Sequence, residues 1–176
     1  TATAREKYSE FKPLASIAGN NKNAEGTEFA IRNLGYSNMS VEQAAASLNV
    51  ALSVADAGDD VTKQVSDIED LVAKGISVLI VNPCDSDAVT GVIEPVKAKG
   101  VKVISVDRAV NGVEIDCQIA SDNVLGAELA TQYIVDTLGE GVKVAELVGT
   151  NGASAAIDRS AGFHNVADSK LTVVAS

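Results

Sequence analysis

The sequence has few of the residues that usually carry catalysis or bind metals. It contains two cysteines, Cys84 and Cys117, and one histidine, His164, and none of these three has a second Cys or His close by. Such spacing does not fit a zinc site, and a single His without a matched Ser or Cys is typical of a structural role. No nucleotide-binding glycine motif or P-loop occurs. We therefore predict no metal, no cofactor and no enzymatic activity.

The two cysteines leave two interpretations open. They are either small buried side chains or the two halves of a disulfide in an oxidising compartment. Sequence alone does not establish the geometry that a disulfide requires.

Basic residues are also in short supply. Fourteen Lys and Arg stand against 24 Asp and Glu, which gives a formal net charge of −10. Because phosphate contacts need clustered Lys and Arg, and no predicted helix carries a basic stripe, we expect no nucleic-acid partner. No run of about 18 uncharged apolar residues occurs either, so no direct membrane insertion is predicted.

Aromatic residues make up only 3% of the chain, whereas 46% is hydrophobic and rich in Ala and Val. From residue 51 onward, β-branched runs alternate with amphipathic stretches at a spacing that suits βα units. This alternation predicts an α/β fold with a doubly wound parallel sheet. The predicted strands are 51–55, 77–81, 101–106, 115–120, 142–148 and 171–174. The predicted helices are 61–74, one after Cys84 that Pro95 kinks or divides, 123–138 and 154–167.

The first 50 residues follow this pattern poorly. They contain polar runs such as GNNKNAEGTE and no convincing first strand. A helix over 41–48, with Ser40 as its cap, is the one regular element predicted there.

Two of the predicted strands end in polar residues that suit a binding site. Asn82 follows the run VLIV, and Asp107 and Arg108 follow the run VISV. In open α/β sheets the ligand lies outside the carboxyl ends of the strands, where these side chains converge if the two strands are neighbours. An amide donates and accepts, a carboxylate accepts and a guanidinium donates in a fixed plane, which together suit the hydroxyls of a polyol.

Each of these residues also has a purely structural interpretation. Asn82 is an ordinary turn residue, and Asp107 with Arg108 can form a local salt bridge. In an extended chain the two side chains are expected to point to opposite sides. Arg159, which follows Asp158 in a predicted helix, is equally compatible with a surface role.

Several segments resemble one family closely. VNPCDSDAV, ISVDRAVNG, IASDNVLGAELATQYI, GEGVKVAELVGTNGASAAIDRSAGF and LTVVAS are similar to the periplasmic ribose-binding proteins, from about residue 51 to the end. That family has the type I periplasmic binding protein fold, in which two doubly wound lobes clamp a monosaccharide. The resemblance implies a first lobe over 1–120, with 1–50 poorly matched, and the incomplete start of a second lobe over 121–176.

The resemblance also implies a site and a role. Asn82, Asp107, Arg108 and Arg159 match sugar-contacting residues of the family, with Arg159 reaching in from the second lobe. The implied partners are a ribose-like monosaccharide, the membrane component of an ABC transporter and, in many members, a chemoreceptor. The implied location is the periplasm, or the cell exterior with a lipid anchor in a Gram-positive source.

Two departures from the family pattern affect the expected affinity. The family's sugar-stacking aromatics fall where this chain has TEFAIRNLGYSN, in which Phe29 and Tyr36 stand at the wrong spacing. The sequence also stops at LTVVAS, before the rest of the second lobe. We therefore expect weak or absent ribose binding by the 176-residue chain.

Two other functions remain as alternatives. The effector-binding core of a sugar-responsive repressor shares the fold, but it should follow a basic helix-turn-helix that the opening region lacks. A small α/β enzyme could use Asp107 as its base, but we find no second catalytic group for it.

Overall fold

The computed structural model describes residues 41–176, which fall into two compact units divided between Val54 and Ala55. The described part of the first unit contains α4 (Val41–Ser47), which confirms the helix predicted over 41–48. The predicted cap Ser40, and the segment that holds Phe29 and Tyr36, lie outside the described residues. The remaining elements belong to the second unit, Ala55–Ser176.

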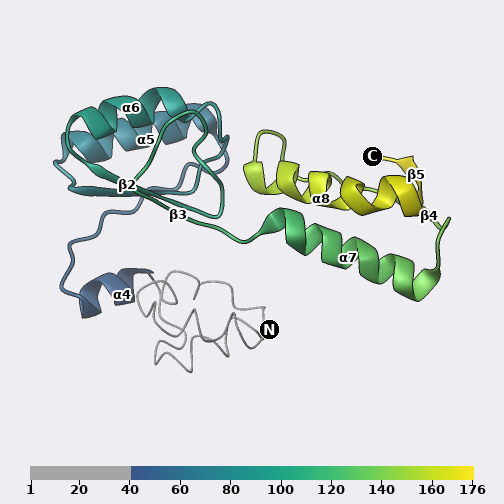
Figure 1. The fold of residues 1–176 in the computed structure, drawn as a ribbon. Coiled ribbons are helices and arrows are strands. Elements are labelled where there is room, and N and C mark those ends of the chain that lie inside the picture. Colours follow the sequence, from purple (N-terminus) through teal and green to yellow (C-terminus); the bar gives the residue numbers. More distant parts are fainter. Residues whose placement is uncertain (1–40) are drawn as a thin grey trace. The chain divides into compact units, whose positions relative to one another are not determined.

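The second unit contains a three-stranded parallel sheet (Figure 1). Its strands are β1 (Val78–Val81), β2 (Lys102–Val106) and β3 (Cys117–Ile119), in that order across the sheet. The helix α5 (Val61–Ala73) precedes β1, and the helix α6 (Thr90–Ala98) connects β1 to β2. Parallel neighbours require such a crossover, so the predicted α/β class is confirmed.

The core of this part lies between the sheet and its two helices. Alternate β1 residues, Leu79 and Val81, are buried, whereas Val78 and Ile80 are about half exposed. Val103 of β2 is fully buried. Each buried aliphatic side chain contributes about 1.5–3 kcal/mol through the hydrophobic effect. The helices and loops supply the rest of the cluster, which comprises Ile68, Val89, Val92, Ile93, Val96, Val101 and Val110.

Local signals in the sequence account for the ends of the helices. Asp60 caps α5, because its side chain accepts a hydrogen bond from the Lys63 backbone N–H at 2.9 Å. After α5, Gly75 adopts a φ of +79°, a left-handed conformation that glycine takes at little cost. Pro95 lies inside α6, which the structure records as a single helix. The predicted division of that helix is therefore not observed.

A second, two-stranded parallel sheet follows. It consists of β4 (Lys143–Ala145) and β5 (Thr172–Ala175). The helix α7 (Asn123–Leu138) precedes β4, and the helix α8 (Ser154–Lys170) connects β4 to β5. The two helices pack side by side (Figure 1). Gly162 makes this approach possible, because a Cβ at that position would collide with the Val124 carbonyl oxygen.

The predicted strand over 51–55 is wrong. Residues 50–57 have no regular structure, and Leu52 and Val54 are exposed. A strand exists only where a neighbour completes its hydrogen bonds, and no described strand pairs with this segment. The other predicted strands are confirmed, although 142–148 is reduced to Lys143–Ala145.

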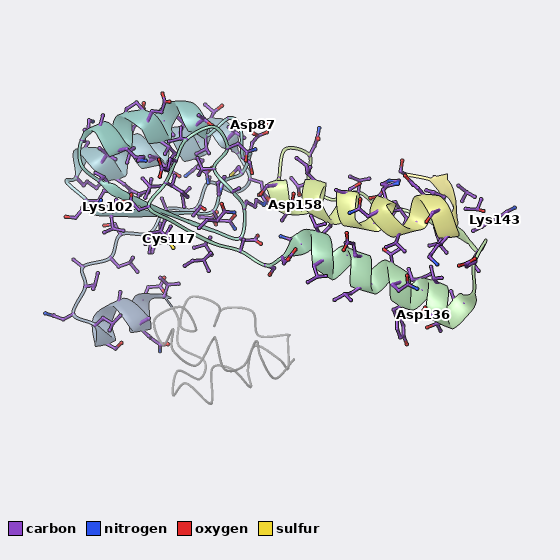
Figure 2. All side chains as sticks on the ribbon, viewed as in Figure 1. Asp87, Lys102, Cys117, Asp136, Lys143 and Asp158 are labelled. Carbon is purple, nitrogen blue, oxygen red and sulfur yellow. The ribbon has the colours of Figure 1, made fainter. Side chains whose placement is uncertain are left out.

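Three further observations concern the cysteines, the length of the helices and the clustering of possible metal ligands. Cys84 and Cys117 are both free thiols, and Cys117 lies on β3 (Figure 2). Within residues 41–176 no helix is long and apolar enough to cross a membrane. The same residues contain no group of three or more His, Cys, Asp and Glu side chains able to hold a metal ion.

His164 joins α8 to the end of β4. Its Nδ1 lies 2.7 Å from Asp168 Oδ1, and its Nε2 lies 3.1 Å from Glu146 Oε2. The hydrogen bond to Asp168 has the largest effect and raises the pKa of His164 above its ordinary value. Burial acts in the opposite direction, and the hydrogen bond to Glu146 raises the pKa further. The protonated ring donates to both carboxylates at once.

The first prediction concerns the titration of this histidine. Since the folded-state pKa is raised, the stabilisation is complete below about pH 6.5, the value expected in the unfolded chain, and is lost as pH rises through the folded-state pKa. NMR titration of this sole His should give a pKa above 6.5 in the native chain, and a lower one in Asp168→Asn. Asp136→Asn, on α7, should leave it unchanged. A native pKa at or below 6.5 would refute the bridge.

Candidate functional site

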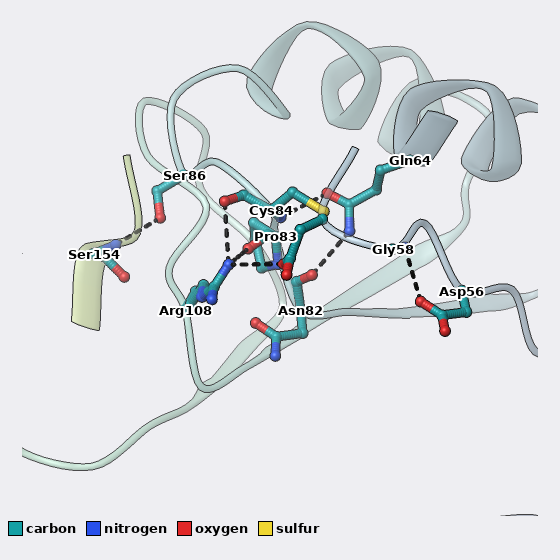
Figure 3. A network of polar contacts seen from close by, with 10 residues as sticks. Asp56, Gly58, Gln64, Asn82, Pro83, Cys84, Ser86, Arg108 and Ser154 are labelled. Carbon is teal, nitrogen blue, oxygen red and sulfur yellow. Dashed lines mark hydrogen bonds and ion pairs between the residues drawn. The ribbon is translucent and has the colours of Figure 1, made fainter. Parts of the chain in front are cut away.

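The loop after β1 is held in place by a side chain from α5. Gln64 donates from Nε2 to the Asn82 carbonyl oxygen at 2.9 Å, and its Oε1 accepts from the Cys84 backbone N–H at 2.9 Å (Figure 3). One amide thus satisfies a donor and an acceptor of the same loop. This fixes the backbone on both sides of Pro83, which is itself buried.

Arg108 connects the loop after β1 with the end of β2. Its Nη1 donates to the carbonyl oxygens of Pro83 and Cys84, each at 3.1 Å, and lies 4.0 Å from Asp59 Oδ1 (Figure 3). The side chain is only 20% exposed. These contacts all involve Nη1. The Nε and Nη2 groups of the guanidinium have no hydrogen-bond partner among the described residues, so they can donate to a ligand.

Asp107 has an unusual backbone conformation. Its φ is +67°, and the Arg108 N–H donates to the Val106 carbonyl at 2.9 Å, which closes a three-residue γ-turn of the rare type. The Asp107 N–H donates to the Ile119 carbonyl at 2.8 Å. The expectation that Asp107 and Arg108 stand on opposite sides of an extended chain is therefore wrong, because the chain turns at Asp107.

The positive φ of Asp107 is a strained conformation that the surrounding hydrogen bonds maintain. A residue at positive φ costs on the order of 1–3 kcal/mol, although Asp and Asn tolerate it better than most. The turn leaves the Asp107 carboxylate exposed. Within residues 41–176, neither this carboxylate nor the Asn82 side-chain amide has a hydrogen-bond partner, so both can accept a ligand.

Asn82 and Arg108 line the same cavity, which has a volume of about 320 Å³. Its lining residues also include Gln64, Asp56, Asp59 and Asp67, which all carry hydrogen-bonding side chains. The structure thus brings two of the four predicted site residues into one cavity. Asp107 adjoins Arg108 in the chain but is not part of the lining.

Cys84 also lines this cavity as a protonated thiol. Burial and then the charge of Asp59 raise its pKa, although Arg108 acts in the opposite direction. Since the thiolate is the reactive form of cysteine, this environment does not favour a nucleophile.

Arg159 lies at a different cavity, of about 610 Å³. Its Nε donates to Asn123 Oδ1 at 2.9 Å, and Asn123 is buried at the start of α7. Phe163 and Ser121 line the same cavity. The structure therefore does not bring Arg159 together with Asn82 and Arg108.

This geometry is accompanied by a match to a known family. The model of the periplasmic binding protein domain matches residues 23–176. The chain belongs to this family. It is 45% identical over 134 residues to the ribose import binding protein of Bacillus subtilis, with 76% of this chain and 44% of that protein covered. It is 41% identical over 130 residues to the Escherichia coli protein of the same name, with 73% and 44% covered.

Solved structures of the family agree with the fold. An ABC transporter solute-binding protein from Mycobacterium smegmatis, with bound glycerol, is similar with a TM-score of 0.69 and 37% identity. The match covers 74% of this chain and 46% of that one. The chain spans less than half the length of the curated relatives that it matches. The type I periplasmic binding protein fold is thus confirmed for the part described.

Sequence reasoning missed Gln64 as a member of this site. It lies on an amphipathic helix, where a polar residue is indistinguishable from any other exposed position. Only the approach of α5 to the loop after β1 makes it a loop-holding residue. One signal was available, because Gln64 stands one turn after the cap Asp60, on the end of α5 nearest the carboxyl ends of the strands.

The second prediction tests this role of Gln64. Gln64→Ala should lower the free energy of unfolding by about 1–3 kcal/mol, because a part-buried N–H and a carbonyl lose their partners. Gln132→Ala is a matched control, since Gln132 bonds only the exposed Asp136 carboxylate on the same helix, and it should change stability by no more than about 0.5 kcal/mol. Equal effects in urea unfolding would show that Gln64 does not hold the loop.

Proposed function

We propose that the protein binds a ribose-like monosaccharide at the carboxyl ends of β1 and β2 and delivers it to the membrane component of an ABC transporter. The observation that carries the proposal is the pairing of Asn82 and Arg108 in one polar cavity at the strand ends. Relatives at 41–45% identity that are named ribose import binding proteins support the choice of ligand.

Each proposed contact follows from the chemistry of the side chain. The Asn82 amide donates to one sugar oxygen and accepts from a hydroxyl, and the Asp107 carboxylate accepts from two hydroxyls. Arg108 donates through Nε and Nη2, while its Nη1 stays bonded to the loop after β1. The role of Arg159 as a donor from a second lobe remains part of the proposal.

The proposal also includes the division into lobes and the place of action. The first sheet ends at Ile119 and the second begins at Lys143, which supports a first lobe over 1–120 and a second from 121. Import binding proteins act outside the cytoplasmic membrane, so we place this chain in the periplasm, or at the cell exterior with a lipid anchor. In such a role the protein is not an enzyme and is no repressor.

The third prediction tests the site with D-ribose. The departures from the family pattern predict weak or absent ribose binding by this chain, and the proposed function commits to weak binding. Titration with millimolar D-ribose should therefore produce saturable chemical-shift changes at the Asn82 side-chain amide and the Arg108 Nε–H. Asp107→Asn should weaken binding by about 2 kcal/mol or more, which is roughly a 30-fold loss of affinity. Asparagine keeps the size of Asp107 and tolerates its positive φ, whereas alanine would add strain.

The control for this variant is Asp70→Asn, which removes an exposed carboxylate from α5 and should leave the affinity unchanged. Absence of any saturable change at millimolar ribose, or equal affinity of Asp107→Asn and the native chain, would contradict the proposed function.

A further inference from the structure

Three loops that are distant in the sequence meet in one hydrogen-bonded junction. We define the three-loop junction as residues 85–88 after β1, 108–111 after β2 and 150–154 before α8. The Ser86 N–H donates to the Gly152 carbonyl at 3.0 Å, and the Asn111 N–H donates to the Ser86 carbonyl at 2.9 Å. The junction therefore joins the first sheet to the part of the chain that contains α8.

Two serine hydroxyls complete the junction. Ser86 Oγ accepts from the Ser154 N–H at 3.2 Å (Figure 3), and Ser154 Oγ accepts from the Ala109 N–H at 2.8 Å. The cap position of α8 is Ala153, which has no side-chain oxygen to bind the first amides of its helix. Ser86 supplies that oxygen from 68 residues away in sequence, so α8 is capped by another part of the chain.

The junction is packed as closely as a core. Ser86 is fully buried, and Ala153 and Ala155 are 2% and 5% exposed. Gly152 has a φ of +81°, and a Cβ at that position would collide with the Asp85 carboxylate. The close approach of the two loops thus depends on a glycine.

Only a short irregular segment connects the first sheet to α7 in the chain. Between β3 and α7 the chain crosses through residues 120–122, which have no regular structure and are exposed. The noncovalent contacts at the three-loop junction therefore contribute strongly to holding the part with the first sheet against the part with the second sheet.

We propose that Ser86 and Ser154 form a latch that keeps α8 against the strand-end loops, and that the closure of this latch determines the sugar affinity of the adjacent site. The second clause rests on the proposed function. Neither serine touches the proposed ligand, so both are positioning residues. If sugar binds with high affinity only while the latch is closed, the apparent dissociation constant rises as the closed fraction falls.

Amide hydrogen exchange tests the latch without any sugar. In the native chain the Ala109 N–H should be protected, and Ser154→Ala should speed its exchange at least tenfold because its acceptor is lost. The Asp107 N–H, bonded to Ile119, lies two residues away and serves as an internal reference that should not change. Ser154→Thr keeps a hydroxyl and should restore the protection of Ala109.

Ser169→Ala is the matched control on α8, because its hydroxyl bonds only the exposed end of the same helix. It should leave the exchange of Ala109 unchanged. Equal exchange of Ala109 in Ser154→Ala and the native chain would overturn the latch, as would a parallel increase at Asp107, which would indicate general destabilisation.

Ribose binding tests the effect on affinity separately. Ser154→Ala should weaken ribose binding severalfold, and Ser154→Thr should restore it. An unchanged affinity together with faster exchange at Ala109 would overturn the link between latch and affinity. If the native chain itself fails to bind ribose, the proposed function and the link between latch and affinity are both wrong. The existence of the latch is still tested by the exchange rate of the Ala109 N–H.

Discussion

The site depends on the parallel pairing of β1 with β2. This register sets Val81 opposite Ser105, so the residues that follow the two strands emerge at the same edge of the sheet. Arg108 can then reach the carbonyl oxygens of Pro83 and Cys84, and it does so with little exposure to solvent. If the register shifted by one residue, each side chain would face the opposite side of the sheet and this contact would be lost.

The same pairing explains why the polar groups are ordered before any ligand arrives. Hydrogen bonds from a guanidinium are stronger than those between neutral groups, and Gln64 fixes the same loop from the other side. The strain at Asp107 is held by neighbours on β2 and β3. A ligand that meets groups already in position loses less of its binding free energy to their ordering.

The parts predicted from sequence were those set by local patterns. The strand–helix alternation from residue 77 and the placing of Asn82 and Arg108 directly after strands both follow from spacing. The strand over 51–55 could not be judged locally, because strand formation requires a partner. The turn at Asp107 and the roles of Gln64 and Ser86 depend on residues from 12 to 68 positions away, which no local pattern encodes.

The central claim is that a sugar binds at the ends of β1 and β2. Its most direct test is a set of intermolecular nuclear Overhauser effects between ¹³C-labelled D-ribose and the ¹⁵N-labelled chain. The account predicts contacts from the sugar protons to the Asn82 side-chain amide and the Arg108 Nε–H. Contacts confined to the cavity of Phe163 and Ser121, with none at Asn82 or Arg108, would contradict it.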